Sequence, residues 1–99
     1  MRSRERELWL SKVKKAANIV QIIKKYIPLE MRGHYWGSCP FHESKVPTLS
    51  VEETSGFFYC FKCHTGGDVF SFVSRVEKIS YLDAARKLAK EYGLEDAPQ

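Results

Sequence analysis

The chain has 99 residues, of which 43% are hydrophobic and 28% are charged, and its formal net charge is +4. This length suits one small domain, and the ordinary hydrophobic fraction argues against a disordered chain. No apolar run approaches the roughly 20 residues of a membrane-spanning helix, and the charged N-terminal stretch lacks the apolar core of a secretory signal, so we expect a cytoplasmic protein without a membrane partner.

The N-terminal part is predicted to be helical and basic. Residues 4–17 have helical composition, and Asn18 is predicted to cap a second, apolar helix, with Gln21 in the capping-box position. Pro28 is expected to end that helix, because the residue before a proline avoids the helical region. Residues 1–25 contain eight Lys or Arg and two Glu, which fits a solvated helix face as well as it fits attraction to a polyanion.

A strand and a hairpin are predicted in the middle of the chain. The Arg32-Gly33 pair indicates a turn, and Tyr35-Trp36 follows it as a strand. Residues 48–51 alternate polar and apolar, and residues 57–60 return as the second strand of a hairpin. Alternation puts Phe57 and Tyr59 on one face and Phe58 on the other.

Four residues have the spacing of a structural zinc site. Cys39 and His42 form a C-x2-H pair, and Cys60 and Cys63 form a C-x2-C pair, with seventeen residues between His42 and Cys60. Each pair fits a tight turn that points two side chains at one ion. Thiolate and imidazole suit Zn²⁺, and four protein ligands leave no open position for catalysis. The sequence therefore predicts one structural Zn²⁺.

Other uses of these residues fit less well. A disulfide would leave one of the three cysteines over, and a Cys–His nucleophile pair would not need two more cysteines at this spacing. A four-thiolate iron site is disfavoured because one ligand is histidine. His64 follows Cys63 directly and is an alternative ligand, whereas His34 is expected at the surface or in a strand.

Two further helices are predicted in the C-terminal part. Asp68 and Ser80 are expected to cap them, Gly93 closes the second, and the residues after Leu94 should fray. The expected inner faces carry Val69, Phe72, Val73 and Val76 on the first helix, and Leu82, Ala85, Leu88, Ala89 and Tyr92 on the second.

The expected fold class is α+β, a zinc ribbon whose small antiparallel sheet is flanked by N-terminal and C-terminal helices. We expect one domain over residues 1–99. Its N-terminal helices are predicted within residues 1–27, the zinc ribbon within 28–67 and the C-terminal helices within 68–93. A bound ion would stabilise the folded state of a domain of this size, because metal binding and folding are coupled in small zinc modules.

The residues indicate a binding module for nucleic acid. No carboxylate cluster, phosphate-cradling glycine motif or open metal site is visible, so no catalytic residue is assigned. Aromatic side chains beside Lys or Arg can hold a single strand by stacking and by neutralising phosphates, although each aromatic could instead be part of the core. The candidate contacts are Arg32, Tyr35, Lys45, Tyr59 and Lys62, with Trp36, Phe57 and Phe61 as further aromatics.

The motifs CPFH, FYCFKC and GGDVFSFV, with Lys45 and Pro47 between the first two, resemble the zinc-binding domain of bacterial DnaG-type primases, the CHC2 zinc-finger family. The resemblance extends from about Asn18 to Gly93. It implies the same four zinc ligands, and it implies DNA contacts by Lys45 and Arg32. Lys62 stands where the family usually has glycine, and Glu30 and Met31 stand where basic residues are common.

The resemblance also implies a function. Such domains bind the single-stranded template and help to choose where an RNA primer starts in DNA replication. A separate Toprim-type polymerase domain, in cis or in trans, carries the nucleotidyltransferase activity of the primosome, and a further region contacts the replicative helicase. This chain should therefore be inactive alone. The alternative is a stand-alone zinc-ribbon module that docks a protein partner.

Overall fold

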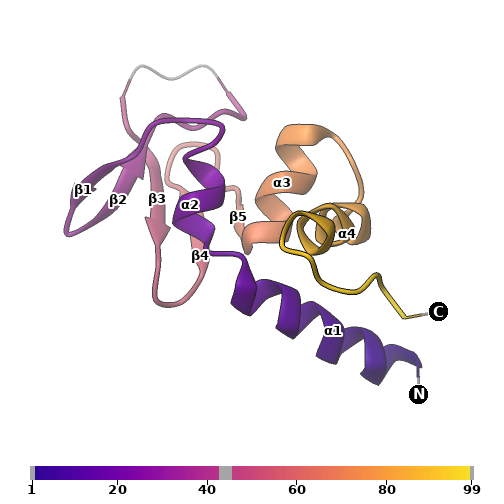
Figure 1. Ribbon diagram of the computed structural model, residues 1–99. Coiled ribbons are helices and arrows are strands. Elements are labelled where there is room, and N and C mark those ends of the chain that lie inside the picture. Colours follow the sequence, from indigo (N-terminus) through magenta and orange to yellow (C-terminus); the bar gives the residue numbers. More distant parts are fainter. Residues whose placement is uncertain (1, 43–45, 99) are drawn as a thin grey trace.

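The computed structural model describes residues 2–42 and 46–98, with side chains from Arg4 onward. Helices lie at both ends of the chain and strands lie between them, as expected for the α+β class (Figure 1). In chain order the elements are α1 (Arg2–Ala16), α2 (Ile19–Ile23), β1 (Glu30–Arg32), β2 (His34–Gly37), β3 (Leu49–Glu52), β4 (Phe57–Cys60), β5 (Gly66–Gly67), α3 (Val69–Glu77) and α4 (Tyr81–Glu91).

The five strands of the described chain form one antiparallel sheet in sequence order, β1 to β5. Ser50 is paired with Trp36 on one side and with Tyr59 on the other. Paired residues point to the same face, and we call the face with Trp36, Ser50 and Tyr59 the open face. The opposite face carries Leu49, Val51 and Phe58, which are buried against α2 and α3. The predicted separation of Phe58 from Phe57 and Tyr59 is confirmed.

The three predicted helix caps are present. Asn18 Oδ1 accepts a hydrogen bond from the Gln21 N–H at 3.0 Å, and Asp68 Oδ1 accepts one from the Ser71 N–H at 2.9 Å. Ser80 Oγ accepts one from the Asp83 N–H at 3.0 Å. Each cap satisfies a backbone donor that the first turn of a helix leaves unpaired.

Two local predictions differ from the structure. Helix α2 ends at Ile23 and continues only as turns, in which Tyr26 N–H and Ile27 N–H both donate to Ile23 O. Tyr26 is turned toward α3, where its hydroxyl donates to Glu77 at 2.7 Å.

Strand β5 was not predicted, because two glycines carry no side-chain pattern. A Cβ on Gly66 would lie 2.8 Å from Phe58 O, so glycine permits this close pairing.

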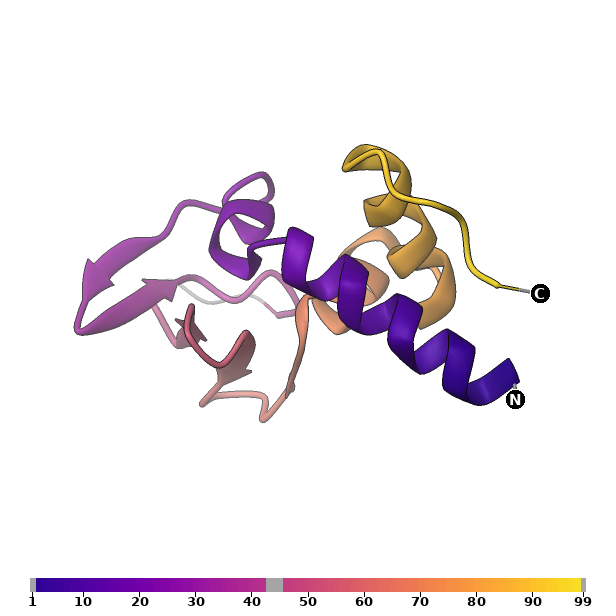
Figure 2. The ribbon, with the colours of Figure 1, turned by 60° about the horizontal axis from the view of Figure 1, so that its bottom comes forward.

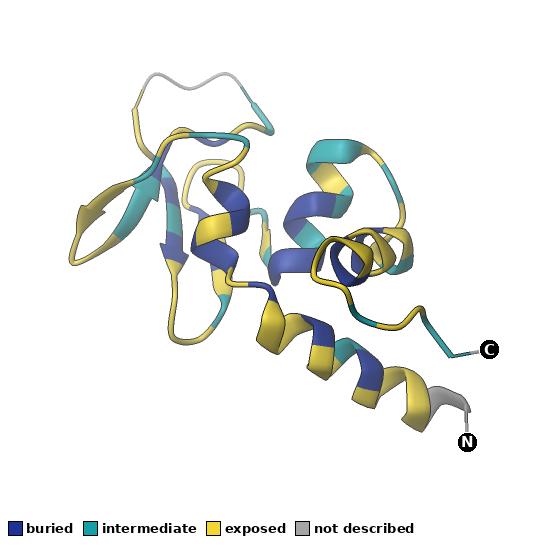
Figure 3. Cartoon of the chain, viewed as in Figure 1, coloured by how far each residue is buried: buried dark blue, intermediate teal, exposed yellow. Residues whose placement is uncertain are grey.

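Helices α3 and α4 each bury one face, and the buried residues differ in part from the predicted ones (Figure 3). On α3, Val69, Phe72 and Val73 are buried as predicted, and Phe70 is buried as well. Tyr92, predicted on the inner face of the last helix, is instead the C-cap of α4 and is exposed. The buried side chains of α4 are Ala84, Ala85, Leu88 and Ala89.

Helix α1 and the β1–β2 hairpin lie at opposite ends of the molecule, whose overall extents, both elements included, are 44 × 24 × 21 Å (Figure 2). Helix α1 is mostly exposed but buries Trp9 and Val13. Trp9 Nε1 donates to Glu95 O at 2.7 Å. Glu95 is therefore held against α1, although the residues after Leu94 were expected to fray. None of the helices in the described part of the chain is long and apolar enough to cross a membrane.

Candidate metal centre and nucleic-acid face

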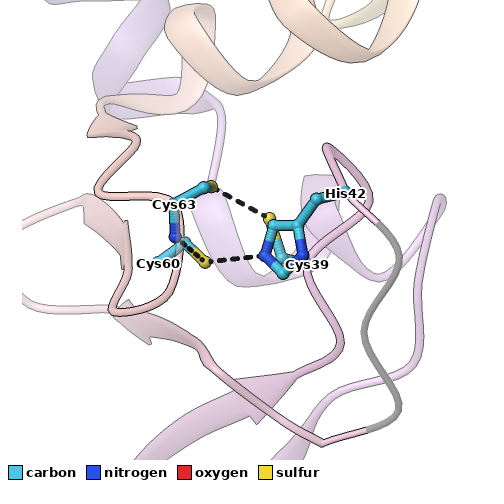
Figure 4. Close-up of side chains that lie close together, drawn as sticks. All are labelled: Cys39, His42, Cys60 and Cys63. Atoms are coloured by element: carbon cyan, nitrogen blue, oxygen red, sulfur yellow. Dashed lines mark hydrogen bonds between the residues drawn. The ribbon is translucent and has the colours of Figure 1, made fainter.

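The four predicted metal ligands come together between two turns (Figure 4). Cys39 and His42 lie in the turn that follows β2, and Cys60 ends β4 with Cys63 in the turn after it. Cys39 Sγ lies 3.8 Å from Cys63 Sγ, and His42 Nε2 lies 3.3 Å from Cys60 Sγ. All four ligand atoms are within 4.8 Å of one another.

These distances fit one tetrahedral zinc ion. With Zn–S near 2.3 Å and Zn–N near 2.0–2.1 Å, tetrahedral angles place two sulfurs about 3.8 Å apart and a sulfur and a nitrogen about 3.6 Å apart. The two measured separations agree with these values to within a few tenths of an ångström. Cys39, His42, Cys60 and Cys63 could therefore hold one zinc ion, as the sequence predicts.

The second turn is built to stabilise a thiolate. The backbone N–H groups of Lys62 and Cys63 each lie 3.4 Å from Cys60 Sγ, and Thr48 Oγ1 is at the same distance. Burial raises the pKa of Cys60, but hydrogen bonds from Cys63, Thr48, His42 and Lys62 outweigh it and lower the pKa to about 5. Since the thiolate is the metal-binding form, the turn of Cys60, together with Thr48 and His42, favours the state of Cys60 that binds a metal.

Cys39 lies in a different environment. Burial raises its pKa to about 12, against a lowering hydrogen bond from the Phe41 backbone. Phe41 holds this turn to the core, with its ring centroid 5.5 Å from that of Phe72 and 6.1 Å from that of Phe58. Cys39 must lose a proton to coordinate a metal, so we expect metal binding to release protons.

The other two histidines lie outside the ligand group found among the described residues. His64 adopts a left-handed backbone conformation, with φ of 56°, and its Nδ1 is 2.8 Å from the Tyr59 hydroxyl. It faces the sheet rather than the four ligand atoms. His34 is exposed on β2.

The predicted DNA contacts do not all share one surface. Tyr59 is on the open face, and alternation from Trp36 through the β1–β2 pairing places Arg32 there too. Tyr35 is on the opposite face, where Lys24 Nζ lies 5.3 Å from its ring centroid. Lys62 is exposed in the second metal turn. Lys45 lies outside the described residues.

The open face carries a row of three aromatic rings, of which Phe61 and Tyr59 are exposed and Trp36 is partly buried. Phe61 is 60% exposed and stacks on Trp36, with ring centroids 5.9 Å apart and an interplanar angle of 28°. Tyr59 meets Phe61 edge to face at 5.1 Å. The sequence named Trp36 and Phe61 only as further aromatics. Their alignment with Tyr59 depends on strand register, which no local pattern reveals.

Two charged residues lie beside this row. Arg32 Nε donates to Glu30 Oε1 at 2.9 Å, and both side chains are largely exposed. From the sequence, Glu30 was named only as a departure from the basic residues common in the family; it is two residues from Arg32 and so on the same strand face. The open face thus combines stacking surfaces with a cation, and a carboxylate lies at its β1 edge.

Comparison with known proteins gives matches along nearly the whole chain. The family model of the CHC2 zinc finger matches residues 6–98. The DNA primase of Rickettsia bellii is 43% identical over 79 residues, which cover 79% of this chain and 13% of that protein. The DNA primase of Borreliella burgdorferi is 42% identical over 86 residues, which cover 86% of this chain and 16% of that protein.

A solved structure has the same fold. The crystal structure of the Aquifex aeolicus primase, comprising zinc-binding and RNA polymerase domains, matches with a TM-score of 0.84 and 40% identity. The match covers 88% of this chain and 22% of that one. The chain therefore spans only a small part of the length of the primases it matches.

Proposed function

The chain belongs to the CHC2 zinc finger family, and from this premise we propose that it is the single-stranded DNA template-binding domain of a DNA primase, which helps to select the start site of the RNA primer. The observation that carries the proposal is the aromatic row of Trp36, Phe61 and Tyr59 on the open face, in which Phe61 and Tyr59 are exposed and Trp36 is partly buried. Exposed stacked rings contribute little to a hydrophobic core, whereas unpaired bases stack on such rings.

The binding mechanism follows from the chemistry of this face. Each base stacked on an aromatic ring contributes roughly 1–3 kcal/mol without regard to base identity. Arg32 and Lys62 supply cations for the phosphates, and Lys45 is proposed to do the same. Bound zinc would cross-link the two turns and so contribute to folding. Cys60 and Cys63 lie on either side of Phe61 and Lys62, so the fold of their turn holds both side chains at the end of β4.

Primer synthesis is proposed to take place elsewhere. The Aquifex primase has a separate RNA polymerase domain, and we propose that such a nucleotidyltransferase domain works with this chain in cis or in trans. The contact with the replicative helicase would then be indirect, through the rest of a cytoplasmic primosome. This chain alone should make no primer.

The test is fluorescence anisotropy of a short labelled DNA strand, titrated with zinc-loaded protein at two salt concentrations. Binding should weaken steeply with salt, because phosphate contacts release counterions. Arg32→Ala combined with Lys45→Ala should weaken binding and flatten the salt dependence. Lys90→Ala, an exposed cation on α4, is the matched control and should change little.

Two outcomes would contradict the proposal. Unchanged affinity in the Arg32 and Lys45 double variant would show that the assigned DNA face is wrong. Absence of binding at low salt would favour a module that docks a protein partner. The exposure of Leu8 on α1, at 67%, is the observation consistent with that alternative.

A further inference from the structure

A cleft on the β1 side of Trp36 adjoins the aromatic row. Its volume is about 360 Å³, within the range of roughly 300–1,000 Å³ of small-molecule sites. It combines an aromatic wall with apolar and polar groups, which suits a flat heterocycle with hydrogen-bonding edges. The lining residues that matter are Leu29, Glu30, Arg32, Trp36, Ser38 and Pro47.

The indole of Trp36 is held in place before any ligand arrives. It stacks on Phe61 at 5.9 Å, and its Nε1 donates to the Arg32 carbonyl oxygen at 3.2 Å. These two contacts fix the ring in the sheet face while it still lines the cleft. A base that stacks there would lose little free energy to ordering of the protein.

The polar edge of the cleft is provided by the pair of Glu30 and Arg32. Glu30 is directly opposite Trp36 in the β1–β2 register, so its side chain stands beside the indole. The ion pair uses Glu30 Oε1 at 2.9 Å. Because both side chains are more than two-thirds exposed, the pair is weak and can rearrange around a ligand.

We propose that this cleft takes one unpaired nucleobase of the template, stacked on Trp36, and that Glu30 selects bases carrying an exocyclic amino group. The inference rests on the proposed function. Adenine, cytosine and guanine can donate an amino N–H to the carboxylate, and Arg32 can donate to a neighbouring ring acceptor. Thymine instead presents carbonyl oxygens on both sides of one N–H, and a carboxylate repels them. The cleft therefore disfavours thymine.

The test compares labelled ten-nucleotide strands of deoxycytidine and of thymidine, bound to the zinc-loaded chain. The unsubstituted protein should bind the cytosine strand about tenfold more tightly. Glu30→Gln should bring the two affinities within about twofold, because an amide can both accept from an amino group and donate to a carbonyl. Glu53→Gln, on the turn between β3 and β4, is the control for losing a negative charge and should keep the ratio.

Stacking is tested separately at Trp36. Trp36→Leu should weaken binding of both strands about tenfold, and Trp36→Phe, which keeps a ring, should restore most of it. An unchanged cytosine-to-thymine ratio in Glu30→Gln would overturn the inference while leaving template binding intact, and so would full affinity in Trp36→Leu. If the unsubstituted chain bound neither strand, the proposed function would fail and this inference with it.

Discussion

The ammonium group of Lys14, on α1, lies 3.0 Å from Asp68 Oδ2. The same oxygen accepts a 2.5 Å hydrogen bond from the Tyr81 hydroxyl at the start of α4, and Asp68 Oδ1 caps α3 through the Ser71 N–H. One nearly buried carboxylate thus joins three helices. Its partners offset the cost of burying the charge.

We expect Asp68→Ala to lower the free energy of unfolding by about 3 kcal/mol, because it removes a helix cap and a charge-assisted hydrogen bond at a buried position. Ser80→Ala is the matched control, since it removes only a cap, and should cost about 1 kcal/mol. Urea unfolding of the zinc-loaded proteins measures both. Equal losses would show that the contacts of Asp68 to α1 and α4 contribute nothing.

The stabilising effect of Asp68 should depend on pH. Burial raises the pKa of Asp68, but Tyr81, Ser71 and Lys14 outweigh it and hold the pKa below its usual 3.8. A carboxyl with a lowered pKa in the folded state stabilises that state above the unfolded pKa, and this effect is lost as the pH falls through the folded pKa.

The difference in free energy of unfolding between the unsubstituted protein and Asp68→Asn should therefore be constant above about pH 5 and shrink below about pH 4. Both proteins are compared at the same pH by urea unfolding, so protonation of the metal ligands affects them alike. A difference that grows toward acid pH would contradict the assigned direction of the pKa shift.

Cys60→Ser should abolish zinc binding and cooperative folding together. Cys60 ends β4 and is fully buried, and structural zinc supplies much of the folding free energy of small zinc domains. Zinc content and a circular-dichroism melt measure the two effects. His64→Ala is the control and should keep one zinc per chain, because His64 bonds to Tyr59 instead. A cooperative melt of Cys60→Ser near that of the parent would refute the prediction.

Neighbouring phenylalanines on β4 should respond differently to truncation. Phe58 is 2% exposed and packs edge to face on Phe72 at 5.4 Å, so Phe58→Ala should cost about 3–5 kcal/mol. Phe57 is 54% exposed, and Phe57→Ala should cost less than about 1 kcal/mol. Urea unfolding compares them, and similar costs would mean that the two faces of β4 are wrongly assigned.

Phe61→Ala should lower the affinity for single-stranded DNA about tenfold while barely changing the melting temperature, because the ring is largely exposed. Anisotropy titration measures the affinity. The control is Tyr92→Ala, which removes an exposed ring from the C-cap of α4, away from the sheet, and should bind as the parent does. If both variants bound equally well, the aromatic row would not be a stacking surface.

Local sequence patterns determined the metal centre and the helix starts. The two x2 pairs, Cys39–His42 and Cys60–Cys63, each close a turn whose geometry depends on a few adjacent residues. The caps at Asn18, Asp68 and Ser80 depend on hydrogen bonds within one helical turn. Such features are readable because their partners are neighbours along the chain.

The tertiary structure alone decided which groups meet across the sheet and between helices. The pairing of β2 with β3 put Trp36 on the open face and Tyr35 on the other, and a shift of one residue would exchange them. The contact of Lys14 with Asp68 and the bond from Trp9 to Glu95 join residues that are distant in the sequence. Strand register and helix packing minimise the free energy of the whole chain, so no short segment contains the information that determines them.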